Sequence, residues 1–112
     1  MKRKILIIDD EVDFCMIMKG YFQRLNYEVL LAYTLREGLA LFQEQRPEIL
    51  FLDNNLPDGN GWDCINEIVE NSPQVMAYLV SAHRNISPLK DPRDNVIVWE
   101  KPISMEMLKK IF

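Results

Sequence analysis

Acidic and other reactive side chains follow directly on short apolar runs at four places in the sequence. In chain order they are Asp9-Asp10-Glu11, Asp53, Ser81 and Lys101. If these side chains meet, their carboxylates repel one another, and a hard divalent cation with oxygen ligands relieves the repulsion. Mg²⁺ is usually held by one or two carboxylates and keeps room for water and phosphate oxygens. A carboxylate beside Mg²⁺ can attack phosphorus and form an acyl phosphate, while a lysine and a hydroxyl neutralise and orient the phosphoryl group.

Whether these residues meet depends on the elements that carry them, and the chain alternates between short apolar runs and amphipathic stretches. The apolar runs predict strands at residues 4–9, 28–32, 48–53, 75–80 and 95–99. Helical spacing of apolar residues predicts helices at 11–25, 35–45, 62–69 and 105–112, and Thr34 with Glu37 forms a capping box before the second. This alternation predicts an α/β domain with a parallel sheet and helices on both faces. Ligands of such folds bind at the carboxyl ends of the strands, where the reactive side chains should gather.

Length and composition indicate one domain, residues 1–112, with the usage of an ordinary soluble protein. Thirteen Lys and Arg against 17 Asp and Glu give a net charge of −4, which argues against duplex-DNA binding because that needs a basic face. No apolar run approaches the roughly 20 residues of a membrane span. We therefore expect neither a membrane nor a nucleic acid as a partner. Cys15 and Cys64 lie apart from each other and from the only histidine, so we expect free thiols in a cytoplasmic protein and no zinc site.

Each residue taken singly also has an ordinary structural explanation. Asp9 could cap a helix, Asp53 could form an Asx turn, and Lys101 could be a solvated loop residue. Their convergence on one sheet edge favours a shared site.

Other phosphate or metal sites fit less well. A Rossmann or P-loop site needs glycines where three acids follow the first strand, and a calcium loop that starts at Asp53 would place Pro57 at its fifth position.

Four motifs, in this order and at these strand ends, resemble those of the receiver domains of two-component response regulators. They are Ile-Leu-Ile-Ile-Asp9-Asp10-Glu11, Phe-Leu-Asp53-Asn-Asn-Leu-Pro57-Asp58-Gly59-Asn-Gly61, Leu-Val-Ser81-Ala82 and Glu-Lys101-Pro102. The resemblance covers nearly the whole chain. It implies a flavodoxin-like three-layer sandwich with a five-stranded parallel sheet in the order 2-1-3-4-5. It also implies a phosphodonor, either a sensor histidine kinase or a histidine phosphotransfer protein.

The resemblance implies a magnesium site at the sheet edge. Asp10 and Asp53 would bind Mg²⁺ directly, together with the backbone carbonyl of Asn55. Asp9 would act through a bound water. The ligands would thus come from the ends of two strands and from the loop after the second.

The resemblance also implies how a phosphoryl group would be held. Asp53 would be the phosphoacceptor, and Lys101 would contact a phosphoryl oxygen. Ser81 would supply the switch hydroxyl that moves to the phosphoryl group. The peptide bond before Pro102 would be cis.

Three features depart from the family pattern. The aromatic switch residue usually stands three positions before the lysine, but Val98 stands there and Trp99 follows it. Successive strand residues face opposite ways, so we expect Trp99 to stay buried and phosphorylation to reorganise Arg84–Asp94 instead. The family pattern places its fourth helix in His83–Asn95. Two prolines in this segment predict that this helix is short or absent, because proline inside a helix costs about 3 kcal/mol. The last predicted helix, residues 105–112, is short. We therefore expect either that this chain is a piece of a longer regulator with an output domain, or that its output face is reduced.

We therefore predict a phosphoryl-accepting signalling switch and not a turnover enzyme, apart from self-phosphorylation and slow self-dephosphorylation. Two alternatives stay open. A Mg²⁺-dependent phosphatase with an aspartyl nucleophile commonly carries a second acid two residues later, and Asn55 occupies that position. A receiver-like scaffold would signal through an intact site without phosphorylation. Turnover of a generic phosphomonoester would identify the phosphatase.

Overall fold

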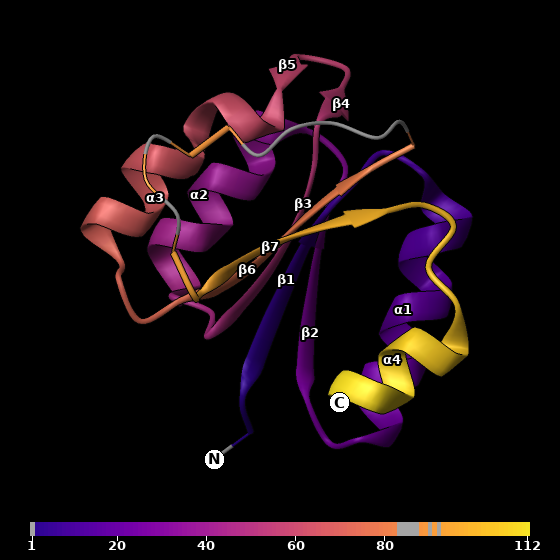
Figure 1. Ribbon diagram of the computed structural model, residues 1–112. Helices are drawn as coiled ribbons and strands as arrows, with labels where there is room; N and C mark the ends of the chain where they lie inside the picture. The colour runs from indigo at the N-terminus through magenta and orange to yellow at the C-terminus, as the bar shows by residue number, and fades with distance from the viewer. Residues whose placement is uncertain (1, 83–87, 90, 92) are drawn as a thin grey trace.

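The fold is a five-stranded parallel sheet between two pairs of helices (Figure 1). The computed structural model describes residues 2–82, 88, 89, 91 and 93–112. The strands of the main sheet are β1 (Lys4–Ile8), β2 (Glu28–Ala32), β3 (Ile49–Asp53), β6 (Met76–Ser81) and β7 (Val96–Glu100). The helices of this described part are α1 (Val12–Arg24), α2 (Leu35–Gln45), α3 (Ile65–Asn71) and α4 (Met105–Ile111), with a 3-10 helix, η1, at Gly61–Cys64. None of these helices is long and apolar enough to cross a lipid bilayer.

Neighbouring strands of the main sheet are all parallel, in the order β2-β1-β3-β6-β7. Counted along the chain, these five strands have the order 2-1-3-4-5, so the predicted flavodoxin-like topology is confirmed. The chain winds outward from β1 to β2 and then returns past β1 to β3. The switch point, where ligands bind in doubly wound folds, therefore lies between the carboxyl ends of β1 and β3.

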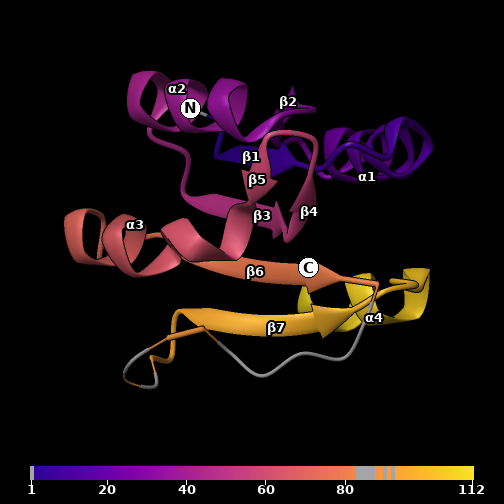
Figure 2. The same cartoon turned by 90° about the horizontal axis from the view of Figure 1, so that it is seen from above.

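Strand residues that alternate in direction build two hydrophobic layers, one on each face of the sheet. One layer, which includes Ile8 and Leu52, packs against α2 and α3. The other, which includes Ile7 and Phe51, packs against α1 and α4. Figures 1 and 2 show the two helix pairs on opposite sides of the sheet. The central strands β1 and β3 are buried on both faces, as expected for continuous apolar runs in a parallel sheet.

Trp99 on β7 is buried, as the sequence predicts. The residue is 6% exposed, and its ring centroid lies 4.8 Å from that of Tyr78 and 5.9 Å from that of Phe51. Val98 lies in the opposite layer, with α2 and α3. The segment His83–Asn95, where the sequence predicts a short or absent helix, lies largely outside the described residues. The expected reorganisation of this segment on phosphorylation therefore stays a prediction.

The chain after β3 differs from the prediction. Its Asn, Gly and Pro content predicts an irregular loop, but β4 (Asn55–Leu56) and β5 (Gly59–Asn60) pair there as a small antiparallel hairpin. At the hairpin turn, the Asp58 carboxylate accepts hydrogen bonds from the backbone N–H groups of the first two residues of α2, at 2.8 and 2.9 Å. These bonds hold the pKa of Asp58 below its ordinary value. Asp58 thus ties the hairpin that follows β3 to the N-terminus of α2.

The predicted capping box before α2 is confirmed in one half. Thr34 Oγ1 accepts a hydrogen bond from the Glu37 N–H at 3.2 Å. The Glu37 carboxylate, however, accepts from the N–H of Tyr33 at 3.1 Å, one residue before the position that a capping box predicts. Because Asp58 takes the first two N–H groups of the helix, the N-terminus of α2 is well satisfied.

Candidate functional site

The carboxylates of Asp9, Asp10 and Asp53 lie together at the carboxyl edge of the sheet. Asp9 and Asp10 directly follow β1, and Asp53 is the last residue of β3. The parallel register pairs Ile8 with Leu52, so the residues after these two emerge next to each other. One oxygen of each of the three carboxylates lies within 4.8 Å of the others. The sequence prediction that these three acids meet is confirmed.

Without a cation, the three carboxylates are unfavourable neighbours. Asp9 is 1% exposed and Asp53 is 5% exposed, whereas Asp10 is exposed. Burial, together with the negative charge of Asp9, raises the pKa of Asp53 from 3.8 to about 6. Beyond its ion pair with Lys101, the Oδ2 atom of Asp9 has no hydrogen-bond partner in the described part of the chain. Buried carboxylate oxygens with unused lone pairs suit a hard cation, so these residues fit Mg²⁺.

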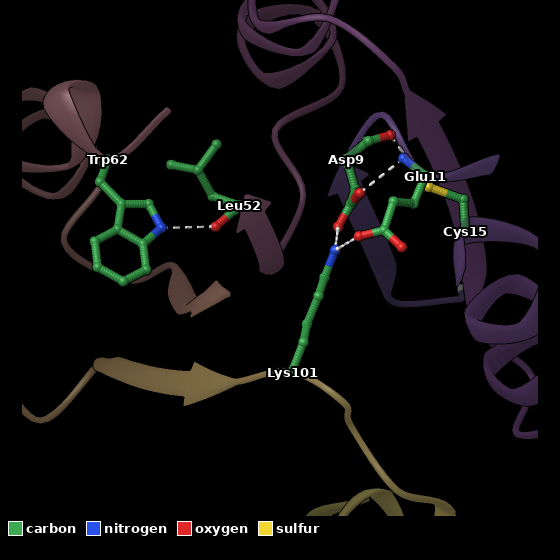
Figure 3. A network of polar contacts seen from close by, with 6 residues as sticks. All are labelled: Asp9, Glu11, Cys15, Leu52, Trp62 and Lys101. Carbon is green, nitrogen blue, oxygen red and sulfur yellow. Dashed lines mark hydrogen bonds and ion pairs between the residues drawn. The ribbon is translucent and has the colours of Figure 1, made fainter. Parts of the chain in front are cut away.

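Lys101 brings a positive charge to the same edge, as Figure 3 shows. Its Nζ atom lies 2.8 Å from Asp9 Oδ2, 2.6 Å from Glu11 Oε1 and 4.5 Å from the centre of the Phe14 ring. Burial lowers the pKa of Lys101, but its hydrogen bonds to Asp9 and Glu11 outweigh burial and leave the pKa above its ordinary value. The side chain is therefore charged at neutral pH. The Lys101–Pro102 peptide bond is cis, as the resemblance implies.

Ser81 and Asn55 complete the set of predicted site residues. Ser81 ends β6 and is 1% exposed, and its carbonyl oxygen accepts the Lys101 N–H at 2.8 Å. This bond holds the carboxyl ends of β6 and β7 side by side. Asn55 is exposed and begins the hairpin strand β4, two residues after Asp53. The roles of the Ser81 hydroxyl and the Asn55 carbonyl stay predictions.

The backbone on both sides of Asp53 is held by residues to which the sequence patterns assign no role at the site. The indole Nε1–H of Trp62 donates to the carbonyl of Leu52 at 3.1 Å (Figure 3). Asn54 accepts hydrogen bonds from the N–H groups of Gly61 and Trp62, at 3.0 and 3.3 Å. A Cβ atom at position 61 would overlap the Asp53 carbonyl oxygen. The motif contains Gly61, but only the close approach of the two backbones explains why a glycine is needed.

Cys15 lies directly under the acidic edge as a free thiol. Its S–H donates to the carbonyl oxygen of Asp9 at 3.3 Å. Burial, together with the negative charge of Asp9, raises the pKa of Cys15 to about 12. The thiol is therefore protonated at neutral pH and is a poor metal ligand. Cys64 is also a free thiol.

Mg²⁺ should stabilise the folded protein, because the cation binds the assembled acidic edge and not the unfolded chain. At about 100 times its dissociation constant, a ligand adds roughly 2.7 kcal/mol to the free energy of unfolding, or about 10 °C in melting temperature. A thermal melt at increasing Mg²⁺ concentration measures this rise. Asp10→Asn should remove most of it, whereas Asp13→Asn, on the exposed first turn of α1, should preserve it. A wild-type melting temperature that does not respond to Mg²⁺ would contradict the metal site.

The chain is a doubly wound α/β domain of the flavodoxin-like class, with three carboxylates and a lysine at the carboxyl edge of its sheet. Within that class, the profile of the response regulator receiver domain matches residues 5–111. The chain therefore belongs to the response regulator receiver domain family, whose members act in two-component signalling.

Relatives of known sequence extend this assignment. The chemotaxis protein CheY of Thermotoga maritima is 32% identical over 83 residues, which cover 73% of this chain and 69% of CheY. The probable transcriptional regulator ycf27 of Cyanophora paradoxa is 31% identical over 111 residues, which cover 96% of this chain and 46% of ycf27. This chain thus spans about half the length of that relative.

Solved structures share the fold. A two-component response regulator from Clostridium difficile matches with a TM-score of 0.84 and 23% identity, over 98% of this chain and 92% of that one. A response regulator from Burkholderia pseudomallei, solved with a phosphorylated aspartic acid, a calcium ion and citrate, matches with a TM-score of 0.80 and 23% identity. That match covers 96% of this chain and 65% of the other. At these identities the likeness concerns the fold alone.

Proposed function

We propose that this chain is a signalling switch in which Asp53 accepts a phosphoryl group from a phosphohistidine in a Mg²⁺-dependent reaction. The observation that carries the proposal is the convergence of three carboxylates within 4.8 Å, with a partly buried lysine paired to one of them. Membership in the receiver family supports the same function. The Burkholderia pseudomallei response regulator, which shares the fold, is itself phosphorylated on an aspartic acid.

The transfer makes one bond and breaks one. A carboxylate oxygen of Asp53 attacks the phosphorus atom, the bond between phosphorus and the histidine nitrogen breaks, and the imidazole leaves. The Lys101 ammonium pairs with one phosphoryl oxygen, and the Ser81 hydroxyl donates to another. Asp10, Asp53 and the Asn55 carbonyl would hold Mg²⁺, which would supply positive charge next to the phosphoryl oxygens. With a pKa of about 6, Asp53 is mostly ionised at neutral pH and is ready to act as the nucleophile.

We infer that the phosphodonor is a sensor histidine kinase or a histidine phosphotransfer protein. In this proposal the domain is modified stoichiometrically and hydrolyses its own acyl phosphate slowly, so it is not a turnover enzyme. Because this chain covers 46% of the Cyanophora paradoxa regulator, an output domain outside this chain belongs to the proposal. The two free thiols support a cytoplasmic location, where thiols stay reduced. The acidic charge argues against direct nucleic-acid contacts by this domain.

Intact-mass analysis after incubation with a small acyl phosphate and Mg²⁺ tests the proposal. The wild type should gain one phosphoryl group that is stable in acid and is lost at neutral to alkaline pH, as an acyl phosphate is. Asp53→Asn should gain none, because an amide is not a nucleophile. Lys101→Ala should gain less, because the phosphoryl charge loses its fixed cation. Labelling of Asp53→Asn at the wild-type rate would show that the acceptor is another residue.

The two alternatives give different results in the same assay. A scaffold that signals without phosphorylation would bind Mg²⁺ but gain no mass. An aspartyl phosphatase would turn over a generic phosphomonoester many times. The exposed amide at Asn55, which cannot transfer a proton as a general acid, disfavours the phosphatase.

A further inference from the structure

Glu11 ends the acidic run after β1, and the proposed function gives it no role. It is the N-cap residue of α1, where a side-chain oxygen commonly accepts a helix N–H, yet its side chain makes no such bond. The Glu11 carboxylate turns instead to Lys101, with Oε1 2.6 Å from Nζ (Figure 3). The side chain is 59% exposed and has no other ion pair in the described part of the chain.

The Lys101 ammonium is paired with two carboxylates on the α1 side of the sheet edge. An ammonium group has three N–H donors. Two carboxylates, those of Asp9 and Glu11, lie within 2.8 Å of Nζ, and the Phe14 ring covers a third side at 4.5 Å. Within the described ranges, no ion pair joins Lys101 to Asp53. A turn of Lys101 toward a phosphoryl group on Asp53 therefore draws the ammonium away from the two carboxylates that hold it.

Glu11 is the partner that Lys101 can leave at the lower cost. Asp9 is 1% exposed, so its separation from Lys101 would leave a buried charge unpaired. The Glu11 carboxylate is largely solvated, and water replaces the lysine when the two separate. A phosphoryl group carries about 1.5–2 negative charges, so it competes with the single charge of Glu11 for the ammonium.

We propose that Glu11 is a positioning residue that holds Lys101 away from Asp53 in the unphosphorylated protein and so slows phosphorylation. The inference rests on the proposed function, because it concerns the lysine that contacts the phosphoryl group. On phosphorylation of Asp53, Lys101 leaves Glu11 and turns to the phosphoryl oxygens. Its ion pair with the buried Asp9 is kept. Glu11 thereby sets how readily the switch accepts its signal.

Three variants separate this contact from general electrostatics. Glu11→Gln removes the charge, and phosphorylation by a small acyl phosphate at fixed Mg²⁺ should become about two- to fivefold faster, the factor expected for a partly exposed ion pair. Glu11→Asp keeps the charge but is one methylene shorter, so it should lose the contact and also react faster. Asp13→Asn removes one charge from the first turn of α1, where Asp13 forms no ion pair with Lys101, and should react at the wild-type rate. Intact-mass time courses give the three rates.

The chemical reactivity of the Lys101 amine provides a second readout that needs no phosphodonor. A water-soluble acylating reagent at limiting concentration, followed by peptide mass spectrometry, reports how freely this amine reacts. It should react slowly in the wild type, where its side chain is 10% exposed and both carboxylates hold it. Both Glu11 variants should react several-fold faster at Lys101, while Lys109 and Lys110 serve as internal references in the same sample.

The outcomes distinguish the inference from the proposed function. Faster phosphorylation of both Glu11 variants, with Asp13→Asn unchanged, supports the positioning role. Equal acceleration by Glu11→Gln and Asp13→Asn, with Glu11→Asp unchanged, overturns it in favour of general charge. A phosphorylated wild type whose Glu11 variants match it in rate and in Lys101 reactivity also overturns it, and leaves the proposed function intact. A wild type that takes up no phosphoryl group overturns both, whatever the reactivity of Lys101.

Discussion

Asp53→Asn should raise the free energy of unfolding of the metal-free protein by about 3 kcal/mol near pH 8, and should change it very little near pH 4. The figure follows from a pKa that rises from 3.8 to about 6 on folding, at about 1.4 kcal/mol per unit. Asparagine has nearly the same shape as aspartic acid but carries no charge. The variant thus removes the repulsion with Asp9 and the burial penalty in one change.

The pH dependence follows from the direction of the pKa shift. Because the pKa of Asp53 is higher in the folded chain, the folded chain binds the proton more tightly than the unfolded chain does. Between about pH 4 and pH 6, this residue therefore makes the wild type less stable as the pH rises. The variant does not titrate at this position. The difference between variant and wild type should accordingly grow through this window and level off above it.

Urea denaturation in the presence of a chelator, at several pH values, measures this difference. Asp63→Asn, which removes an exposed charge from η1, is the matched control and should leave stability within about 0.5 kcal/mol of the wild type. Addition of Mg²⁺ should shrink the advantage of Asp53→Asn, because only the wild type retains the full set of carboxylate ligands. An advantage of equal size at pH 4 and pH 8 would contradict a penalty caused by ionisation.

Gly61→Ala should destabilise the protein by about 3 kcal/mol, the upper part of the usual range for overpacking. A Cβ atom at this position would overlap the Asp53 carbonyl oxygen and lie 2.9 Å from Leu52 Cδ1. The overlapping atom belongs to the backbone of the central strand β3, so it cannot turn away as a side chain would. Relief requires a shift of η1 or of Asp53 itself. The response of the melting temperature to Mg²⁺ should therefore weaken together with stability.

Gly20→Ala is the matched control for this change. Gly20 lies within α1, and an added Cβ there would meet no atom within 4 Å. Alanine favours the helix over glycine by about 0.5–1 kcal/mol, so this variant should be slightly more stable than the wild type. Chemical denaturation of both variants gives the comparison. Equal effects of the two substitutions, or a Gly61→Ala protein as stable as the wild type, would contradict the close backbone approach.

The three carboxylates of the site could be predicted because the local sequence pattern places them at strand ends. Asp9, Asp10 and Asp53 each end or follow a continuous apolar run, and parallel strands bring such ends to one edge. The burial of Trp99 was also predictable, since neighbouring residues of a strand face opposite ways. The hairpin after β3 was not, because two strands of two residues each leave no periodic signal.

The amino-acid sequence by itself determined the order of strands and helices, the parallel sheet and the edge at which the acids meet. The succession of strands and helices follows from short-range periodicity in the local sequence. The parallel sheet then follows from the general right-handedness of crossover connections. Only the tertiary structure decided which partner each charged side chain takes. Lys101 pairs with Glu11 across 90 positions, and Asp58 reaches α2 across 22 and 23 positions. Such contacts depend on how loops from distant strands approach each other, and no periodic pattern encodes that distance.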